Sequence, residues 1–247
     1  MKFSAHSLNS LISCSNILKS GWEKAIIGPV LKNAANKIWL FDYDLTLYGE
    51  EERYVLNSLD KRIALYVQKT VGGTFEQASE IRRDYLLRFG TTLAGLQAMH
   101  GVNPEDFFDF IHEPEFLIYP KESPQKRELL LSLNGRRIVF TNGRHDWSEA
   151  GMRSMGFLDV MDAVFDLKQM DWVGKPHESA YEKMETFLGR TVSQNSDIVL
   201  LEDSLRNLEP AHKRGWTTIF VNPLAKAPEW VDYQIPHLMS LSEILEG

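Results

Sequence analysis

The chain has 247 residues, of which 43% are apolar and 25% are charged, a composition typical of a globular protein. Its formal net charge of −7 argues against nonspecific partners such as nucleic acid or anionic membrane, so an anionic substrate would need local positive charge. A single cysteine, Cys14, excludes an internal disulfide and favours a reducing, cytoplasmic location.

The first 36 residues differ in composition from the rest of the chain. They contain one acidic residue, Glu23, and no arginine, and no run of apolar residues approaches the length of a transmembrane helix. We interpret residues 1–36 as an amphipathic extension that packs on the domain or on a partner. An organelle-targeting peptide is the alternative.

Short β-rich runs recur after this extension, and each of them ends in polar residues. Strands are predicted at 37–44, 136–143, 162–166, 197–203 and 217–222, and helical patterns lie between the later ones at 147–155, 178–188 and 205–214. This alternation predicts an α/β fold with a Rossmann-like parallel sheet and helices on both faces.

The interval between the first two strands is too long for a simple crossover. Residues 52–118 carry helical periodicity interrupted at Gly72, Gly73, Gly101 and Pro104. We therefore predict an inserted helical cap over 52–118, and a core formed by 37–51 and 119–247.

Candidate functional groups follow four of the predicted strands. In open parallel sheets, ligands bind at the carboxyl ends of strands, where the strand order reverses. One polar strand end would be unremarkable, but four together predict an active site. The groups are Asp42 and Asp44, then Thr141, Asn142 and Gly143, then Lys175 after a loop, and Glu202 with Asp203.

Carboxylates from two strands could share a hard divalent cation. Asp42 and Asp203, with the backbone carbonyl of Asp44, offer the oxygen ligands that Mg²⁺ prefers. Strict alternation along an extended strand would place Asp42 and Asp44 on one side. One could then attack phosphorus while the other exchanges a proton with the leaving oxygen. Lys175 would neutralise charge, and Thr141 with nearby backbone amides would hold the phosphoryl group.

The ordered motifs Asp42–Thr46 (DYDLT), Thr141-Asn142, Lys175-Pro176 and Glu202-Asp203 resemble those of the haloacid dehalogenase (HAD) superfamily of aspartate-nucleophile phosphatases. The resemblance implies that Asp42 is the nucleophile and Asp44 the acid/base. It also implies that Asp42, Asp44 and Asp203 bind Mg²⁺, with Glu202 as an outer or water-mediated partner.

A narrower resemblance points to the pyrimidine 5′-nucleotidase-like branch. FDYDLTLY and the cap segment YLLRFGTTLAGL, residues 85–96, look like its motifs, which implies a nucleoside 5′-monophosphate as the small-molecule partner. Substrate contacts are expected from Asn142 and Gly143 and, on the cap, from Tyr85, Arg88, Thr91 and Thr92. Gly90 would let the cap backbone approach the ligand. Asn142 and Ser204 could equally be loop hydrogen bonders, and Asn207 could orient the loop after the fourth strand.

Three residues depart from that branch: Leu45 replaces Asn or Gly, Glu202 replaces Asp, and Trp147 stands at a usual His position, which we expect near the mouth of the site. Substrate identity therefore stays open between nucleotides and sugar phosphates, phosphoglycolate or lysophosphatidate. A phosphomutase or a binding module is a weaker alternative. A hydrolytic dehalogenase would need neither Asp44 nor a metal. His145 and His177 are titratable, but the mechanism requires neither.

Overall fold

The computed structural model describes residues 28, 30–31, 36–190 and 192–245. A six-stranded parallel sheet forms its centre, in the order β3-β2-β1-β4-β5-β6. The strands are β1 (Lys37–Phe41), β2 (Gly135–Phe140), β3 (Ala163–Phe165), β4 (Ile198–Glu202), β5 (Thr217–Val221) and β6 (Tyr233–Ile235). The predicted α/β class and the parallel sheet are confirmed. The short β6 was not predicted, because three residues carry too little pattern.

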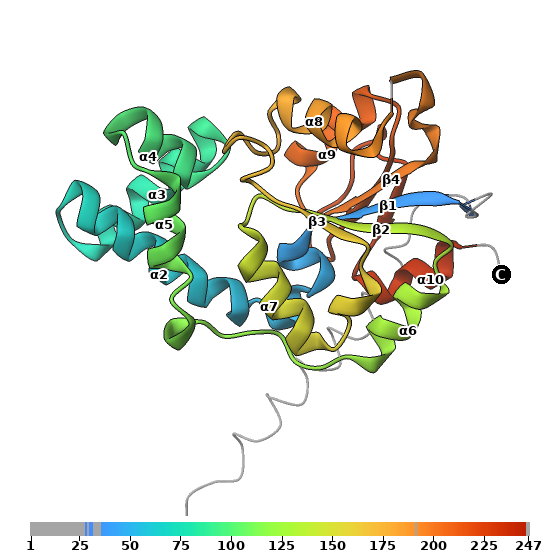
Figure 1. Cartoon of the computed structure of the whole chain (residues 1–247), viewed down its shortest axis with the longest axis horizontal. Coiled ribbons are helices and arrows are strands. Elements are labelled where there is room, and N and C mark those ends of the chain that lie inside the picture. The colour runs from blue at the N-terminus through green and yellow to red at the C-terminus, as the bar shows by residue number, and fades with distance from the viewer. Residues whose placement is uncertain (1–27, 29, 32–35, 191, 246–247) are drawn as a thin grey trace, which may run out of the picture.

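Helices cover both faces of the sheet (Figure 1). On one side lie α8 (Glu178–Leu188) and α9 (Leu205–Lys213). On the other lie α6 (Pro124–Ser132), α7 (His145–Met155) and α10 (Leu241–Ile244). The carboxyl-terminal halves of the central strands β1 and β2 are apolar and buried, and the side chains of β4 are all buried. Burial on both faces explains why these strands read as continuous apolar runs.

Four helices, α2 (Tyr54–Val71), α3 (Phe75–Phe89), α4 (Thr92–His100) and α5 (Pro104–Ile111), form a separate layer to the left of the sheet in Figure 1. We call these four helices the cap. Three of these helices start at a side-chain cap: Thr74, Thr91 and Asn103 cap the starts of α3, α4 and α5 by accepting backbone hydrogen bonds.

Residues of the predicted N-terminal extension are described at four positions. The Leu31 amide donates to the carbonyl of Ile244 at 2.6 Å, and the Leu31 side chain is buried. This part of the extension therefore packs beside the C-terminal helix α10. Cys14 and most of the extension lie outside the described residues.

Candidate active site

Asp42 lies immediately after β1, at the point where the strand order reverses. The strand β1 is flanked by β2 and β4, and the Asp42 amide continues the pairing by donating to the carbonyl of Leu201 at 2.9 Å. Its carboxylate accepts a hydrogen bond from Nζ of Lys175 at 2.9 Å. Lys175 also donates to Glu202 at 2.7 Å and to the Phe140 carbonyl at 2.6 Å, and its side chain is fully buried.

Three carboxylates and one lysine lie together at this edge of the sheet. Oxygens of Asp42, Glu202 and Asp203 lie within 4.8 Å of one another. Burial raises the pKa of Asp42 to about 8, and Glu202 adds to the rise while Lys175 opposes it. Burial, followed by Glu202 and Asp42, also raises the pKa of Asp203 well above its usual value.

This donor set fits a hard divalent cation. When all three clustered carboxylates are ionised and Lys175 is counted, two negative charges remain, and every ligand offered is an oxygen, as Mg²⁺ prefers. Burial lowers the pKa of Lys175, but Asp42 and Glu202 outweigh this effect and raise it above its usual value. The lysine therefore stays charged between its two partners. Glu202 contacts Lys175 directly, a role that its expected place as an outer metal partner did not include.

Asp44 is reached by a tight turn and not by a strand. The strand β1 ends at Phe41, and Tyr43–Leu47 form an irregular helical turn in which Leu45 adopts a left-handed φ of 59°. The prediction of an extended run to Asp44 is therefore wrong, and strand alternation does not explain how the two aspartates are placed. Asn and Gly adopt such a φ readily, which accounts for the usual residues at the Leu45 position.

One oxygen of Asp44 receives two hydrogen bonds. Its Oδ1 accepts from the Tyr48 hydroxyl at 2.5 Å and from Nε1 of Trp147 at 3.0 Å. Burial raises the pKa of Asp44, and these two hydrogen bonds oppose the rise. Trp147 is buried in α7, so its expected position at the mouth of the site is wrong. The indole instead contacts the carboxylate of the candidate acid/base.

The loop after β2 supports Lys175. Asn142 Oδ1 accepts from the Lys175 amide, and its Nδ2 donates to the Lys175 carbonyl, both at 2.8 Å. The Asn142 side chain is thus engaged by protein backbone, which favours the loop-bonding alternative over direct phosphate binding. Thr141 is buried, and its Oγ1 accepts from the Gly143 amide at 3.0 Å. The Thr141 hydroxyl donates no hydrogen bond to any residue that the structure describes.

A cleft of about 550 Å³ lies between the cap and the strand ends. Apolar side chains of the cap form much of one wall, and polar groups of the core form the other. From the core, the lining includes Asp44, Asn142, Gly143, Ser204, Arg206 and Asn207. From the cap, it includes Thr91, Thr92, His112 at the end of α5, and the bidentate ion pair of Arg82 with Asp60.

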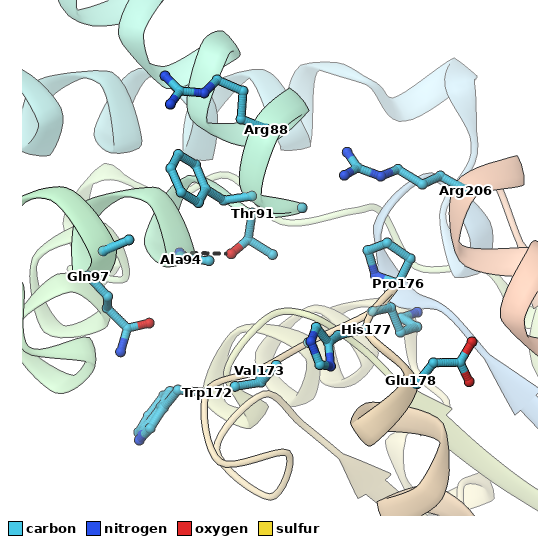
Figure 2. Close-up of a pocket in the computed structure, with 15 residues that line it drawn as sticks. Arg88, Thr91, Ala94, Gln97, Trp172, Val173, Pro176, His177, Glu178 and Arg206 are labelled. Atoms are coloured by element: carbon cyan, nitrogen blue, oxygen red, sulfur yellow. Dashed lines mark hydrogen bonds between the residues drawn. The ribbon is translucent and has the colours of Figure 1, made fainter.

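An adjoining hollow of about 780 Å³ shares Gly90, Thr91 and Arg206 with this cleft. Figure 2 shows Arg88 on the cap side of this hollow and both Arg206 and His177 on the core side. Of the four cap residues expected to contact substrate, three line these spaces and one does not. Thr91, Thr92 and Arg88 line these spaces, although Arg88 is exposed and pairs with Asp84.

Tyr85 lines neither space. Its ring packs so closely on α4 that a Cβ placed at Gly95 would lie 2.4 Å from it, and its hydroxyl is 2.8 Å from Nε2 of His100. The structure does not bring Tyr85 to either space, because the residue fills the α3–α4 interface. His112 was missed: its Nδ1 pairs with Asp146 at 3.0 Å. No short motif marks it.

His145 and His177 lie at the starts of α7 and α8. His145 pairs with Asp166 at 3.2 Å and His177 with the Ser179 hydroxyl at 3.0 Å. Neither residue lines the cleft beside Asp44. Asn207, also predicted as an outer partner, lines that cleft, and its carbonyl accepts a 2.5 Å hydrogen bond from the Tyr181 hydroxyl.

Solved structures share this architecture. A HAD phosphatase from Thermococcus onnurineus superposes with a TM-score of 0.57 at 21% identity, over 84% of this chain and 97% of that one. The chain has the HAD fold. YfnB from Bacillus subtilis, bound to magnesium, gives a TM-score of 0.56 at 15% identity over 85% and 98% of the two chains. An L-2-haloacid dehalogenase from Xanthobacter autotrophicus with covalently bound chloropropionic acid gives 0.51 at 18% over 85% and 98%.

The low identities mean that these likenesses establish the HAD fold, and the chemistry must be argued from the site. No family model matches the chain. Within the described residues, no helix has both the length and the apolar character needed to cross a membrane.

Proposed function

We propose that the chain is a phosphomonoester hydrolase in which Asp42 is the nucleophile and Asp44 the general acid and base. The observation that carries this proposal is the junction of Asp42, Lys175, Glu202 and Asp203 at the switch point of the sheet, with Asp44 beside the cleft. A lysine-paired carboxylate for attack, and a second carboxyl group for proton transfer, are what phosphoryl transfer to an aspartate requires.

In the first step, a carboxylate oxygen of Asp42 attacks phosphorus and the bond to the leaving oxygen breaks. Asp44 gives its proton to that oxygen, so the alcohol leaves neutral. In the second step, Asp44 takes a proton from water, whose oxygen attacks the aspartyl phosphate. Inorganic phosphate then leaves and the Asp42 carboxylate returns. The Lys175 ammonium neutralises Asp42, and the Thr141 hydroxyl hydrogen would support a phosphoryl oxygen.

Asp42 and Asp203 would hold Mg²⁺ through their carboxylates and Asp44 through its backbone carbonyl. When bound, the cation supplies positive charge against the phosphate dianion. The acidic cluster supports this assignment by its oxygen-only chemistry and its excess negative charge.

For the substrate we propose a nucleoside 5′-monophosphate, with pyrimidine nucleotides first. The resemblance of FDYDLTLY and of residues 85–96 supports it, and Gly90, Thr91 and Thr92 of that segment line the cleft. A cleft of about 550 Å³ is of the size that holds a small molecule.

A hydrolytic dehalogenase is the second candidate, because an L-2-haloacid dehalogenase shares the fold. That reaction also begins with carboxylate attack, but it needs no proton donor at the leaving halide and no metal. The hydrogen-bonded Asp44 and the surplus of carboxylates favour the phosphatase.

The deciding experiment measures phosphate release, with Mg²⁺ and with chelator, from UMP, CMP, dTMP, AMP, GMP, phosphoglycolate, glucose 6-phosphate and lysophosphatidate. Chloride release from 2-chloropropionate is measured alongside. We expect chelator-sensitive phosphate release, highest with UMP and CMP, and its loss in Asp42→Asn. Activity on a different ester would reject the nucleotide assignment alone. Chloride release without phosphate release would reject the phosphatase.

A further inference from the structure

The two hydrogen bonds to Asp44 converge on one of its two carboxyl oxygens. Tyr48 and Trp147 both donate to Oδ1, at 2.5 and 3.0 Å. We propose that Trp147, assisted by Tyr48, is a positioning residue that confines the transferable proton of Asp44 to Oδ2 and directs it at the leaving oxygen. The inference rests on the proposed function and names residues that determine how poor a leaving group the site can expel.

A carboxyl oxygen can accept two hydrogen bonds. Oδ1 has two lone pairs, and each of the two donors occupies one, so a proton on Oδ1 would displace a hydrogen bond in a buried site. Oδ2 makes no hydrogen bond to any described residue. The proton therefore resides on Oδ2, and Asp44 lies in the lining of the cleft that would hold the leaving group.

The donors are themselves held by aromatic packing. The Trp147 ring is buried, stands edge-on to Tyr43 with centroids 6.0 Å apart, and stacks on His112 at 5.8 Å and 22°. Tyr48 is also buried and meets the Tyr43 ring edge-on at 5.2 Å. This packing fixes the direction of the indole N–H. Because the N–H bonds Asp44, it also fixes the orientation of the proposed general acid, and fixed orientation favours catalysis.

The packing also ties the acid to the cap. His112 follows the last turn of α5, and it pairs with Asp146 of α7, the residue before Trp147. The cap end and the indole therefore rest on one another. Asp44 is oriented by a side chain that a cap residue covers.

The consequence is measurable through the leaving group. As the phosphorus–oxygen bond breaks, an alkoxide or a basic phenoxide must receive the Oδ2 proton, whereas 4-nitrophenoxide leaves without it. General acid catalysis contributes about 10²–10⁴-fold when it is needed. A misdirected proton therefore costs rate in proportion to the basicity of the leaving group, and a merely structural defect costs rate equally for all of them.

The test compares kcat/KM for 4-nitrophenyl phosphate and 4-methoxyphenyl phosphate, two esters of similar size, in the full-length Mg²⁺-loaded protein. For Trp147→Phe we expect about a tenfold greater loss on the methoxy ester than on the nitro ester. Tyr48→Phe, which removes one hydroxyl oxygen and serves if Trp147→Phe fails to fold, should show the same direction. Trp147→His, which keeps an N–H donor, should recover part of the difference.

Trp216→Phe is the matched control. Trp216 is an equally buried tryptophan whose Nε1 donates to Glu185 at 3.3 Å, outside the residues that line the cleft. We expect this variant to change the two esters equally. Equal losses on both esters in the Trp147 and Tyr48 variants would overturn the inference. Asp44→Asn distinguishes failure of this inference from failure of the proposed function. If Asp44→Asn also loses the same rate on both esters, the general-acid role of Asp44 is rejected.

Discussion

Lys175 neutralises the buried carboxylates that it contacts, so its removal would leave their negative charges unpaired. Its ammonium bonds two buried carboxylates, Asp42 and Glu202, and the Phe140 carbonyl. Asn142 fixes the backbone of the same residue from the end of β2. Removing one partner of a buried ion pair is costly because the other charge stays buried and unpaired.

We expect Lys175→Met to lower the free energy of unfolding by about 3–5 kcal/mol and to abolish phosphate release. The double variant Lys175→Met/Glu202→Gln removes one of the stranded charges. It should recover part of the stability and none of the activity. Urea unfolding followed by circular dichroism measures both variants. A single variant as stable as the parent would show that the ammonium does not compensate these carboxylates.

Asp203 contributes a second test, through the dependence of stability on pH. A carboxyl group whose pKa is raised on folding binds more protons in the folded than in the unfolded state. Stability of the metal-free protein should therefore fall as the pH rises from about 4 toward 8, across the raised pKa values of Asp42 and Asp203.

We expect Asp203→Asn to raise the melting temperature in chelator at about pH 8 by roughly 2–4 °C, because one repelling charge is gone. The same variant should lose most of the further stabilisation that Mg²⁺ gives the parent protein. Thermal unfolding with and without Mg²⁺ measures both effects. An undiminished Mg²⁺ shift in the variant would remove Asp203 from the metal site.

At the scale of elements, sequence patterns predicted the sheet and the strand ends because periodicity and polar termini are local signals. Contacts between distant segments were not predictable in this way. Trp147 meets Asp44 across 103 positions, and Asn142 meets Lys175 across 33. Neither spacing belongs to a periodic pattern. Strand alternation was the wrong geometric basis for placing Asp44 near Asp42, because a turn places the second aspartate.

The contact of α7 with the turn Tyr43–Leu47 leads to a separate prediction. Gly151 lies inside α7, and a Cβ placed there would be 1.5 Å from the Tyr43 hydroxyl and 2.6 Å from its Cζ. Helix propensity alone favours alanine over glycine by about 1 kcal/mol. The clash reverses the sign, because Tyr43 is buried and overpacking costs about 1–3 kcal/mol.

We therefore expect Gly151→Ala to destabilise the protein by about 1–3 kcal/mol and to lower kcat, since α7 also carries Trp147. Adding Tyr43→Phe removes the nearest atom and should restore part of the stability. Chemical unfolding and kcat on one active ester are measured for both variants. A stabilising Gly151→Ala would mean that α7 can withdraw from the turn without cost.

For the molecule as a whole, a charged seam joins cap and core beside the cleft. Glu105 of α5 pairs with Lys168 at 2.6 Å and with Arg144 at 3.4 Å, and Arg144 also pairs with Asp109 at 2.6 Å. On the other side, Arg206 of α9 donates to the Leu86 carbonyl of α3 at 3.0 Å. These links are partly exposed, so each contributes modestly and is screened by salt.

Neutralising the seam should loosen the cap more than it destabilises the fold. For Glu105→Gln we expect KM to rise about two- to fivefold, with unfolding changed by less than about 1 kcal/mol, because both core cations lose the same partner. Rising salt should raise the KM of the parent and so reduce the difference in KM between the parent and Glu105→Gln. Asp171→Asn is the control, since its pair with Lys183 lies within the core. The measurement is steady-state kinetics at low and high salt. An equal rise of KM in the control, or no rise in Glu105→Gln, would show that the seam does not control how the cap closes on the core.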